Sequence, residues 1–244
     1  DRLRHPHRGE DPDRLTVEIF PTGAKWVRSL HPWGRSGPRD GGDLPHWREA
    51  GEESATPLRE VGGDRWHPGG VHLTAELGDL TTTVADVLVN AANASLLGGG
   101  GVDGALHAAA GPALLDACRR VRRDTWPGGL PVGDAVATEA GDLPARWVVH
   151  TVGPNRHAGE RDPALLTSCF TRALDVADDL GAQSVAFPAV SAGVYGWPMA
   201  EVARVAVAAV RGWRDDHPGS SVAEVRFVLV SRAAYEVFAA ELAD

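Results

Sequence analysis

The stretch DVLVNAANASLLGGGGVDGALH, residues 86–107, combines three patterns in one continuous segment. Its first six residues form a short apolar run that is typical of a buried strand. Four consecutive glycines follow at positions 98–101, and a helical pattern starts at Val102. A glycine-rich loop between a strand and a helix presents free backbone N–H groups, and the positive end of the helix dipole, to an anion. The stretch therefore predicts an α/β unit with an anion-binding loop.

This loop differs from two phosphate-binding motifs with similar letters. Read from Gly99 it matches G-x-G-x-x-G, but a dinucleotide-binding unit places its glycines directly after the strand, and here the strand ends near Ala92. The acidic residue at the expected distance, Asp124, follows an arginine-rich helical stretch instead of a second strand. No Gly-Lys-Ser/Thr follows, which excludes a P-loop. A plain flexible turn is the alternative, although ordering four glycines is entropically unfavourable unless a close approach requires them.

Strands and helices alternate on both sides of this stretch. The expected strands are 71–77, 86–91, 135–139, 147–151, 184–187 and 225–230, and the expected helices are 102–121 with an interruption at Gly111-Pro112, 163–180, 198–213 and 232–242. Strands that alternate with helices of roughly 10 to 20 residues predict an α/β fold. We expect a three-layer α/β/α sandwich with a mixed, mostly parallel central sheet.

The first 66 residues have a different composition. They hold seven of the 17 prolines and only ten Leu, Ile, Val or Phe residues, so little apolar surface is available for burial. We predict a low-order N-terminal extension over residues 1–66, with a possible strand at 15–20, followed by one domain over 67–244. Four tryptophans could anchor the extension to that domain, and a small accessory fold is the alternative. These tryptophans are Trp26, Trp33, Trp47 and Trp66.

Charge and cysteine content exclude several function classes. The chain of 244 residues has 33 acidic and 24 basic residues, for a net charge of −9, which argues against nucleic-acid binding by bulk electrostatics. Two cysteines, Cys118 and Cys169, are too few for a disulfide scaffold or a cysteine-rich zinc site, and neither H-E-x-x-H nor G-x-S-x-G occurs. We expect no metal and no cofactor. With neither a signal peptide nor a membrane-spanning run, we expect a cytoplasmic protein.

Polar residues cluster around the glycine loop and around a second loop, residues 191–196, that follows the strand at 184–187. Asn90 and Asn93 flank the end of a buried strand, where function collects in α/β folds. Asn90 has the simpler alternative of bonding a neighbouring loop, whereas the amide of Asn93 suits a sugar hydroxyl. Asp103 and His107 share a helical face, and their alternatives are a helix cap and a partly buried histidine. Asp79 suits either a turn or an exocyclic amine.

These motifs, in this order, resemble the MacroD-type branch of the macrodomain family. The resemblance covers roughly residues 70–242 and leaves the first 66 outside. Its motifs are GDLT at 78–81, VNAAN at 89–93, LLGGGGVDGALH at 96–107, AAGP at 109–112, LPA at 143–145, HTVGP at 150–154, FPA at 187–189 and SAGVYGWP at 191–198. Several linked motifs in a fixed order make this a specific signal.

The resemblance implies an α/β/α domain that binds ADP-ribose and hydrolyses ADP-ribosyl esters without a metal. It implies removal of mono-ADP-ribose from acidic side chains and deacetylation of O-acetyl-ADP-ribose. Asp79, beside Leu80, would take the adenine amine, and Asn93, Asp103 and His107 would form the catalytic group, with Asp103 or a substrate phosphate oxygen activating water. The remaining expected ligand contacts are Asn90, Gly99, Gly100, Gly101, Val102, Ser191, Ala192, Gly193, Val194, Tyr195, Gly196 and Val230.

Two alternatives to the hydrolase stay open: a reader that binds ADP-ribose without turnover, and an ADP-ribose-1″-phosphate phosphatase. Expected partners are ADP-ribose and mono-ADP-ribosylated proteins, with no membrane, and we expect a monomer. One departure from the family pattern concerns Val230, which stands where the family usually carries an aromatic ring stacked on adenine. Because base–aromatic stacking is worth roughly 1–3 kcal/mol, we predict weaker adenine binding.

Overall fold

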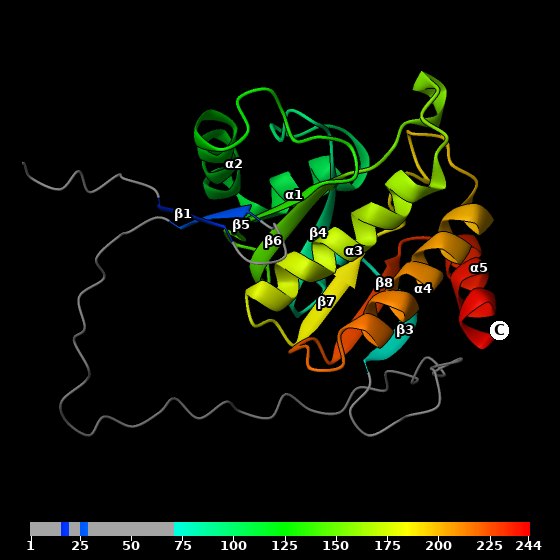
Figure 1. Cartoon of the computed structure of the whole chain (residues 1–244). Coiled ribbons are helices and arrows are strands. Elements are labelled where there is room, and N and C mark those ends of the chain that lie inside the picture. Colours follow the sequence, from blue (N-terminus) through cyan, green and yellow to red (C-terminus); the bar gives the residue numbers. More distant parts are fainter. Residues whose placement is uncertain (1–15, 20–24, 29–70) are drawn as a thin grey trace, which may run out of the picture.

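A six-stranded mixed sheet forms the middle of the computed structural model, which describes residues 16–19, 25–28 and 71–244 (Figure 1). Its strands run in the order β3-β8-β7-β4-β6-β5. Their bounds are β3 His72–Leu77, β4 Ala85–Ala92, β5 Ala135–Glu139, β6 Ala145–Val152, β7 Ser184–Phe187 and β8 Glu224–Leu229. All neighbours pair in parallel except β5 and β6, so the carboxyl ends of five strands meet at one edge of the sheet.

Helices cover both faces of this sheet, as the expected sandwich requires (Figure 1). The helices are α1 Gly101–Ala110, α2 Pro112–Asp124, α3 Pro163–Asp179, α4 Met199–Asp216 and α5 Arg232–Ala243. Successive side chains of β4 go to opposite faces: Val87 and Val89 pack in the core beneath α3, α4 and α5, and Leu88 packs in the core beneath α1 and α2. The three-layer α/β/α prediction is therefore confirmed.

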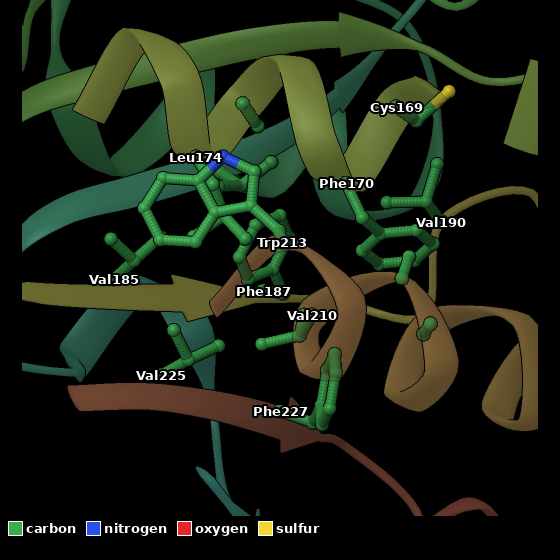
Figure 2. Packing of buried hydrophobic residues seen from close by; sticks show 14 of the residues in the cluster. Cys169, Phe170, Leu174, Val185, Phe187, Val190, Val210, Trp213, Val225 and Phe227 are labelled. Atoms are coloured by element: carbon green, nitrogen blue, oxygen red, sulfur yellow. The ribbon is translucent and has the colours of Figure 1, made fainter. Parts of the chain in front are cut away.

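Aromatic side chains fill the larger of the two cores, beneath α3, α4 and α5 (Figure 2). The ring of Phe187 lies 5.3 Å from that of Phe170 and 6.2 Å from that of Phe227, centroid to centroid, in the tilted arrangements that aromatic rings prefer. Trp213 closes this core from α4, and its indole N–H donates to the Asp175 carboxylate over 2.7 Å. This packing anchors β7 through Phe187 and β8 through Phe227.

The predicted elements agree with the observed ones to within a few residues. The single helix expected over 102–121 is two helices, because Gly111 adopts a φ of 70° and Pro112 starts α2 at a position that needs no N–H donor. Two single-turn helices, η1 (Leu80–Thr82) and η2 (Arg156–Ala158), lie in loops at the carboxyl edge. No helix in the described part of the chain is long and apolar enough to cross a bilayer.

Two short strands lie in the N-terminal region. β1 (Thr16–Ile19), within the strand expected at 15–20, pairs antiparallel with β2 (Lys25–Arg28). Trp26 lies in β2. The rest of the predicted low-order extension, with its anchors Trp33, Trp47 and Trp66, lies outside the described residues.

Candidate functional site

A cavity of about 610 Å³ opens at the carboxyl edge of the sheet, a size typical of small-molecule and cofactor sites. The loops and strand ends that follow β3, β4, β7 and β8 form its walls. It is lined by residues 78–81, 91–93, 99–103, 105, 153, 188, 189, 191–195, 199, 228–231 and 234. The cavity therefore brings together segments that are more than 150 residues apart in sequence.

Most of the predicted site residues line this cavity. They are Asp79, Leu80, Asn93, Gly99, Gly100, Gly101, Val102, Asp103, Ser191, Ala192, Gly193, Val194, Tyr195 and Val230. Three predicted residues, Asn90, His107 and Gly196, are outside the lining. Sequence reasoning missed the contributions of Gly153, Met199 and Ala234, although Gly153 belongs to the HTVGP motif already noted.

Asp103 lies in the first turn of α1, where a negative charge is favoured by the helix dipole. Gly100, not Asp103, is the N-cap of this helix, so the capping alternative for Asp103 is wrong. The side chain is buried, and its Oδ1 accepts a hydrogen bond of 2.7 Å from Nδ2 of Asn90. His107 Nε2 lies 3.5 Å from the same oxygen. Within the described residues, the other oxygen, Oδ2, has no hydrogen-bond partner, so it can accept from a ligand or a water.

Asn93 stands beside Asp103 and is held by its own loop. Its Nδ2 donates to the Gly98 carbonyl over 2.9 Å, and its Oδ1 accepts from the Ser95 backbone N–H over 2.9 Å. A β-carbon placed on Gly99 would lie 3.0 Å from Asn93 Nδ2 and 2.9 Å from Asp103 Oδ2. One N–H donor and one carboxylate acceptor thus converge on the same point, which the missing side chain of Gly99 leaves open.

Asn90, one of the predicted ligand contacts, lies outside the cavity lining. It is completely buried, and its Nδ2 contacts Asp103 Oδ1 and, at 3.1 Å, Nδ1 of His150. Asn90 follows Leu88 by two positions on β4 and shares its face, which turns the side chain toward the layer beneath α1 and α2. It contacts Asp103 from behind and does not reach the cavity. His107 is also outside the cavity lining, and its ring contacts the Asp103 carboxylate.

The second loop, residues 191–196, contains an unusual backbone conformation and is held by a hydrogen bond from a neighbouring loop. Ser191 has a φ of 67°, which is unusual for a residue with a β-carbon, and its buried hydroxyl has no protein partner among the described residues. The Arg156 backbone N–H donates to the Tyr195 carbonyl over 2.9 Å. Gly196, with a φ of 73°, faces the His157 ring and takes no part in the lining. Burial is the main cause that raises the pKa of Tyr195, and the carboxylates of Asp103 and Glu160 add to it.

Asp79 and Val230 line the cavity where β3 and β8 end side by side. Asp79 caps η1, with Oδ1 accepting from the Thr81 backbone N–H and hydroxyl, each over 2.8 Å. The cap leaves the second oxygen, Oδ2, for other donors. Asp79 can therefore stabilise the turn and accept a hydrogen bond from an exocyclic amine at the same time. Val230 follows β8 directly and is 87% exposed. A search of the described residues finds no group of three His, Cys, Asp or Glu side chains placed to hold a metal ion.

Comparison with known proteins agrees with this geometry. The family model described as "Macro domain" matches residues 89–206. A macro domain-containing protein of Streptomyces coelicolor is 56% identical over 170 residues, which cover 70% of this chain and 98% of the relative. The chain belongs to the macrodomain family.

Two further similar proteins have a named activity or a structure with a bound ligand. This macrodomain is 52% identical over 141 residues to a protein of Escherichia fergusonii named O-acetyl-ADP-ribose deacetylase, covering 57% of this chain and 78% of that one. It also resembles the solved macrodomain of Oceanobacillus iheyensis with ADP, at 36% identity and a TM-score of 0.68, covering 75% of this chain and 96% of that chain. The mixed six-stranded sheet of the macrodomain thus has a solved counterpart.

Proposed function

We propose that this macrodomain binds ADP-ribose and hydrolyses ADP-ribosyl esters, both mono-ADP-ribose on acidic side chains and O-acetyl-ADP-ribose. The observation that carries the proposal is the convergence of Asn93 Nδ2 and Asp103 Oδ2 beside Gly99. The relative named for deacetylation of O-acetyl-ADP-ribose and the neighbour solved with ADP support it.

The diphosphate would be bound by backbone groups. Residues 67–244 hold 13 basic and 21 acidic residues, a net charge of −8, so bulk charge opposes an anionic ligand. The first N–H groups of α1 have no partners within the helix, and the helix dipole favours an anion there. Gly100, Gly101 and Val102 stand at this end of α1 and line the cavity. Residues 191–195 would enclose the diphosphate from the other side.

Ester cleavage needs a positioned water and a base. Asp103 Oδ2 would take a proton from a water, while the one free N–H of the Asn93 amide orients the ribose. The water oxygen adds to the acyl carbon and the acyl–oxygen bond breaks, which releases a carboxylic acid. The ribose oxygen regains a proton from Asp103. His107, at 3.5 Å from Oδ1, would support the carboxylate without touching substrate.

The deciding experiment follows release of ADP-ribose from a target protein modified on glutamate. We expect turnover by the wild-type chain and its loss in the double variant Asp103→Ala, Asn93→Ala with an unchanged circular dichroism spectrum. Asp116→Ala, which removes an exposed carboxylate on α2, is the matched control and should keep full activity. Full turnover by the double variant would contradict the proposal.

The same preparation distinguishes the two alternatives. A reader would bind ADP-ribose in calorimetry but release none from the modified target. A phosphatase would release inorganic phosphate from ADP-ribose-1″-phosphate while leaving the ester intact. Either result in the wild-type chain replaces the hydrolase with that function.

A further inference from the structure

A line of buried polar side chains leads from Asp103 away from the cavity. It comprises Asn90 on β4, His150 on β6 and Thr138 on β5, all of them buried. Asn90 Nδ2 lies 2.7 Å from Asp103 Oδ1 and 3.1 Å from His150 Nδ1, and His150 Nε2 lies 2.9 Å from the Thr138 hydroxyl. The parallel register of β4 and β6 pairs Asn90 with His150, so the contact is built into the sheet. None of these three residues lines the cavity.

Hydrogen-bond chemistry fixes the direction of this line. Asn90 Nδ2 carries two hydrogens, and it faces one carboxylate oxygen and one ring nitrogen. In this orientation both hydrogens find acceptors if His150 Nδ1 carries no proton. The ring proton is then on Nε2, where it faces the Thr138 hydroxyl, with the Cys118 sulfur 3.6 Å away. Burial, with a smaller contribution from His107, lowers the pKa of His150 to about 3, so the ring is neutral at pH 7.

If the Asn90 amide were turned by 180°, its contacts would require protons on the Asp103 carboxyl and on His150 Nδ1. It would place an amide oxygen against Asp103 Oδ1, and two acceptors at 2.7 Å repel unless the carboxyl is protonated. It would also need the proton of His150 on Nδ1. An acceptor at His150 Nδ1 thus selects the amide orientation that suits an ionised Asp103. Around Asp103 the other titratable groups are His107, Cys118 and Tyr195.

We propose that His150 and Asn90 are positioning residues for ester hydrolysis: the ring nitrogen of His150 orients the Asn90 amide, which holds Asp103 through Oδ1 and leaves Oδ2 without a protein partner for the reaction. This inference rests on the proposed function, because it concerns the base of that reaction. It assigns a role to two side chains that lie outside the cavity lining. The predicted effect is on turnover and its pH dependence, and not on ligand affinity.

The test compares two substitutions of the same residue. His150→Leu removes the acceptor, whereas His150→Asn keeps an amide oxygen at about the position of Nδ1. For release of ADP-ribose from a glutamate-modified target, we expect His150→Leu to lower kcat by roughly ten- to a hundredfold, the range for disturbing the hydrogen bond from Asn90 to the charged Asp103 carboxylate. We expect the acidic limb of its pH–rate profile to move to higher pH, because the carboxylate loses a hydrogen-bond donor. The Kd for ADP-ribose should stay within about twofold, and His150→Asn should recover most of the kcat.

A neighbouring variant controls for loss of stability. Val149→Ala truncates the next side chain of β6, which is equally buried but packs on the opposite face of the sheet. It should lower the melting temperature while keeping kcat and the acidic limb. If His150→Leu does not fold, Thr138→Val, which removes the partner of His150 Nε2, carries the test with a smaller change in the same direction.

Each outcome is decisive. Wild-type kcat and an unmoved acidic limb in the folded His150→Leu variant, or in Thr138→Val where that variant is the one tested, would overturn the positioning role and leave the proposed hydrolase intact. No turnover by the wild-type chain would overturn the proposed function, and this inference with it.

Discussion

Asn93 and Asp103 face each other across Gly99, with Nδ2 of one and Oδ2 of the other each about 3 Å from the position of a β-carbon on that glycine. The donor and the acceptor are carried by different elements, the loop after β4 and the first turn of α1. The space between them exists only because residue 99 has no side chain.

Substitution of Gly99 should therefore separate folding from function. We expect Gly99→Ala to keep the fold, since the residue is exposed, and to lower ester turnover at least tenfold, because the methyl group occupies the point where Asn93 and Asp103 converge. Gly128→Ala, at an exposed glycine with open space around it, is the control for the general effect of replacing glycine. Release of ADP-ribose and thermal unfolding of both variants measure the two effects. Equal activity of Gly99→Ala and the wild-type chain would refute this account.

The rim residue Val230 gives a prediction for affinity. It is 87% exposed at the end of β8 and lines the cavity near Asp79. We expect Val230→Phe to strengthen ADP-ribose binding by roughly 1–3 kcal/mol through stacking on the base. Val84→Phe, at a valine that is 73% exposed and outside the cavity, is the matched control. Calorimetric titration measures both, and an unchanged Kd for Val230→Phe would count against an adenine site at this end.

Buried His150 predicts a pH dependence of stability. The imidazole has an ordinary pKa of 6.5, and burial lowers the pKa of His150 to about 3 in the folded chain. Between these two values the unfolded chain binds the proton and the folded chain does not, so stability falls as the pH drops below about 6.5. The slope is at most about 1.4 kcal/mol per pH unit. Urea unfolding at pH values between about 5 and 7 should show a shallower dependence for His150→Asn than for the wild-type chain. Parallel curves would exclude a neutral buried His150.

The two thiols give a fourth prediction. Burial raises the pKa of Cys118 to about 12 and that of Cys169 to about 11. Since the thiolate is the reactive form, iodoacetamide at neutral pH should modify neither cysteine in the folded chain and both in denaturant. Ala108→Cys, on the exposed face of α1, is the positive control. Mass spectrometry counts the adducts. Above a pH of about 9 the unfolded thiols ionise first, so stability should fall there as the pH rises.

Local patterns were sufficient to predict the elements and the loops. The apolar run of β4, the proline that starts α2 and the two glycine-rich loops are signals within a few residues of each other. Because ligand sites of α/β folds lie at the carboxyl ends of strands, residues next to these loops, such as Asn93 and Asp103, could be assigned to the site from the sequence.

Contacts that depend on strand order could not be predicted in the same way. Asn90 and His150 are 60 positions apart and meet only because β4 pairs with β6. The sequence shows neither that pairing nor the position of β8 between β3 and β7. A stricter use of the two-residue period would have placed Asn90 on the same face as Leu88, away from the cavity.

The pairing of β3 with β8 has a consequence for biosynthesis. β3 is the first and β8 the last strand of the six-stranded sheet along the chain. At their carboxyl ends the Gly78 N–H donates to the Leu229 carbonyl. A ribosome that has released the chain as far as β7 leaves β3 without its partner and β7 with an open, aggregation-prone edge. Asp79 and Val230 become neighbours only when the last strand emerges. Prematurely terminated chains would therefore lack the wall of the pocket formed by residues 228–231 and 234, and with an open sheet edge they would be substrates for chaperones and proteases.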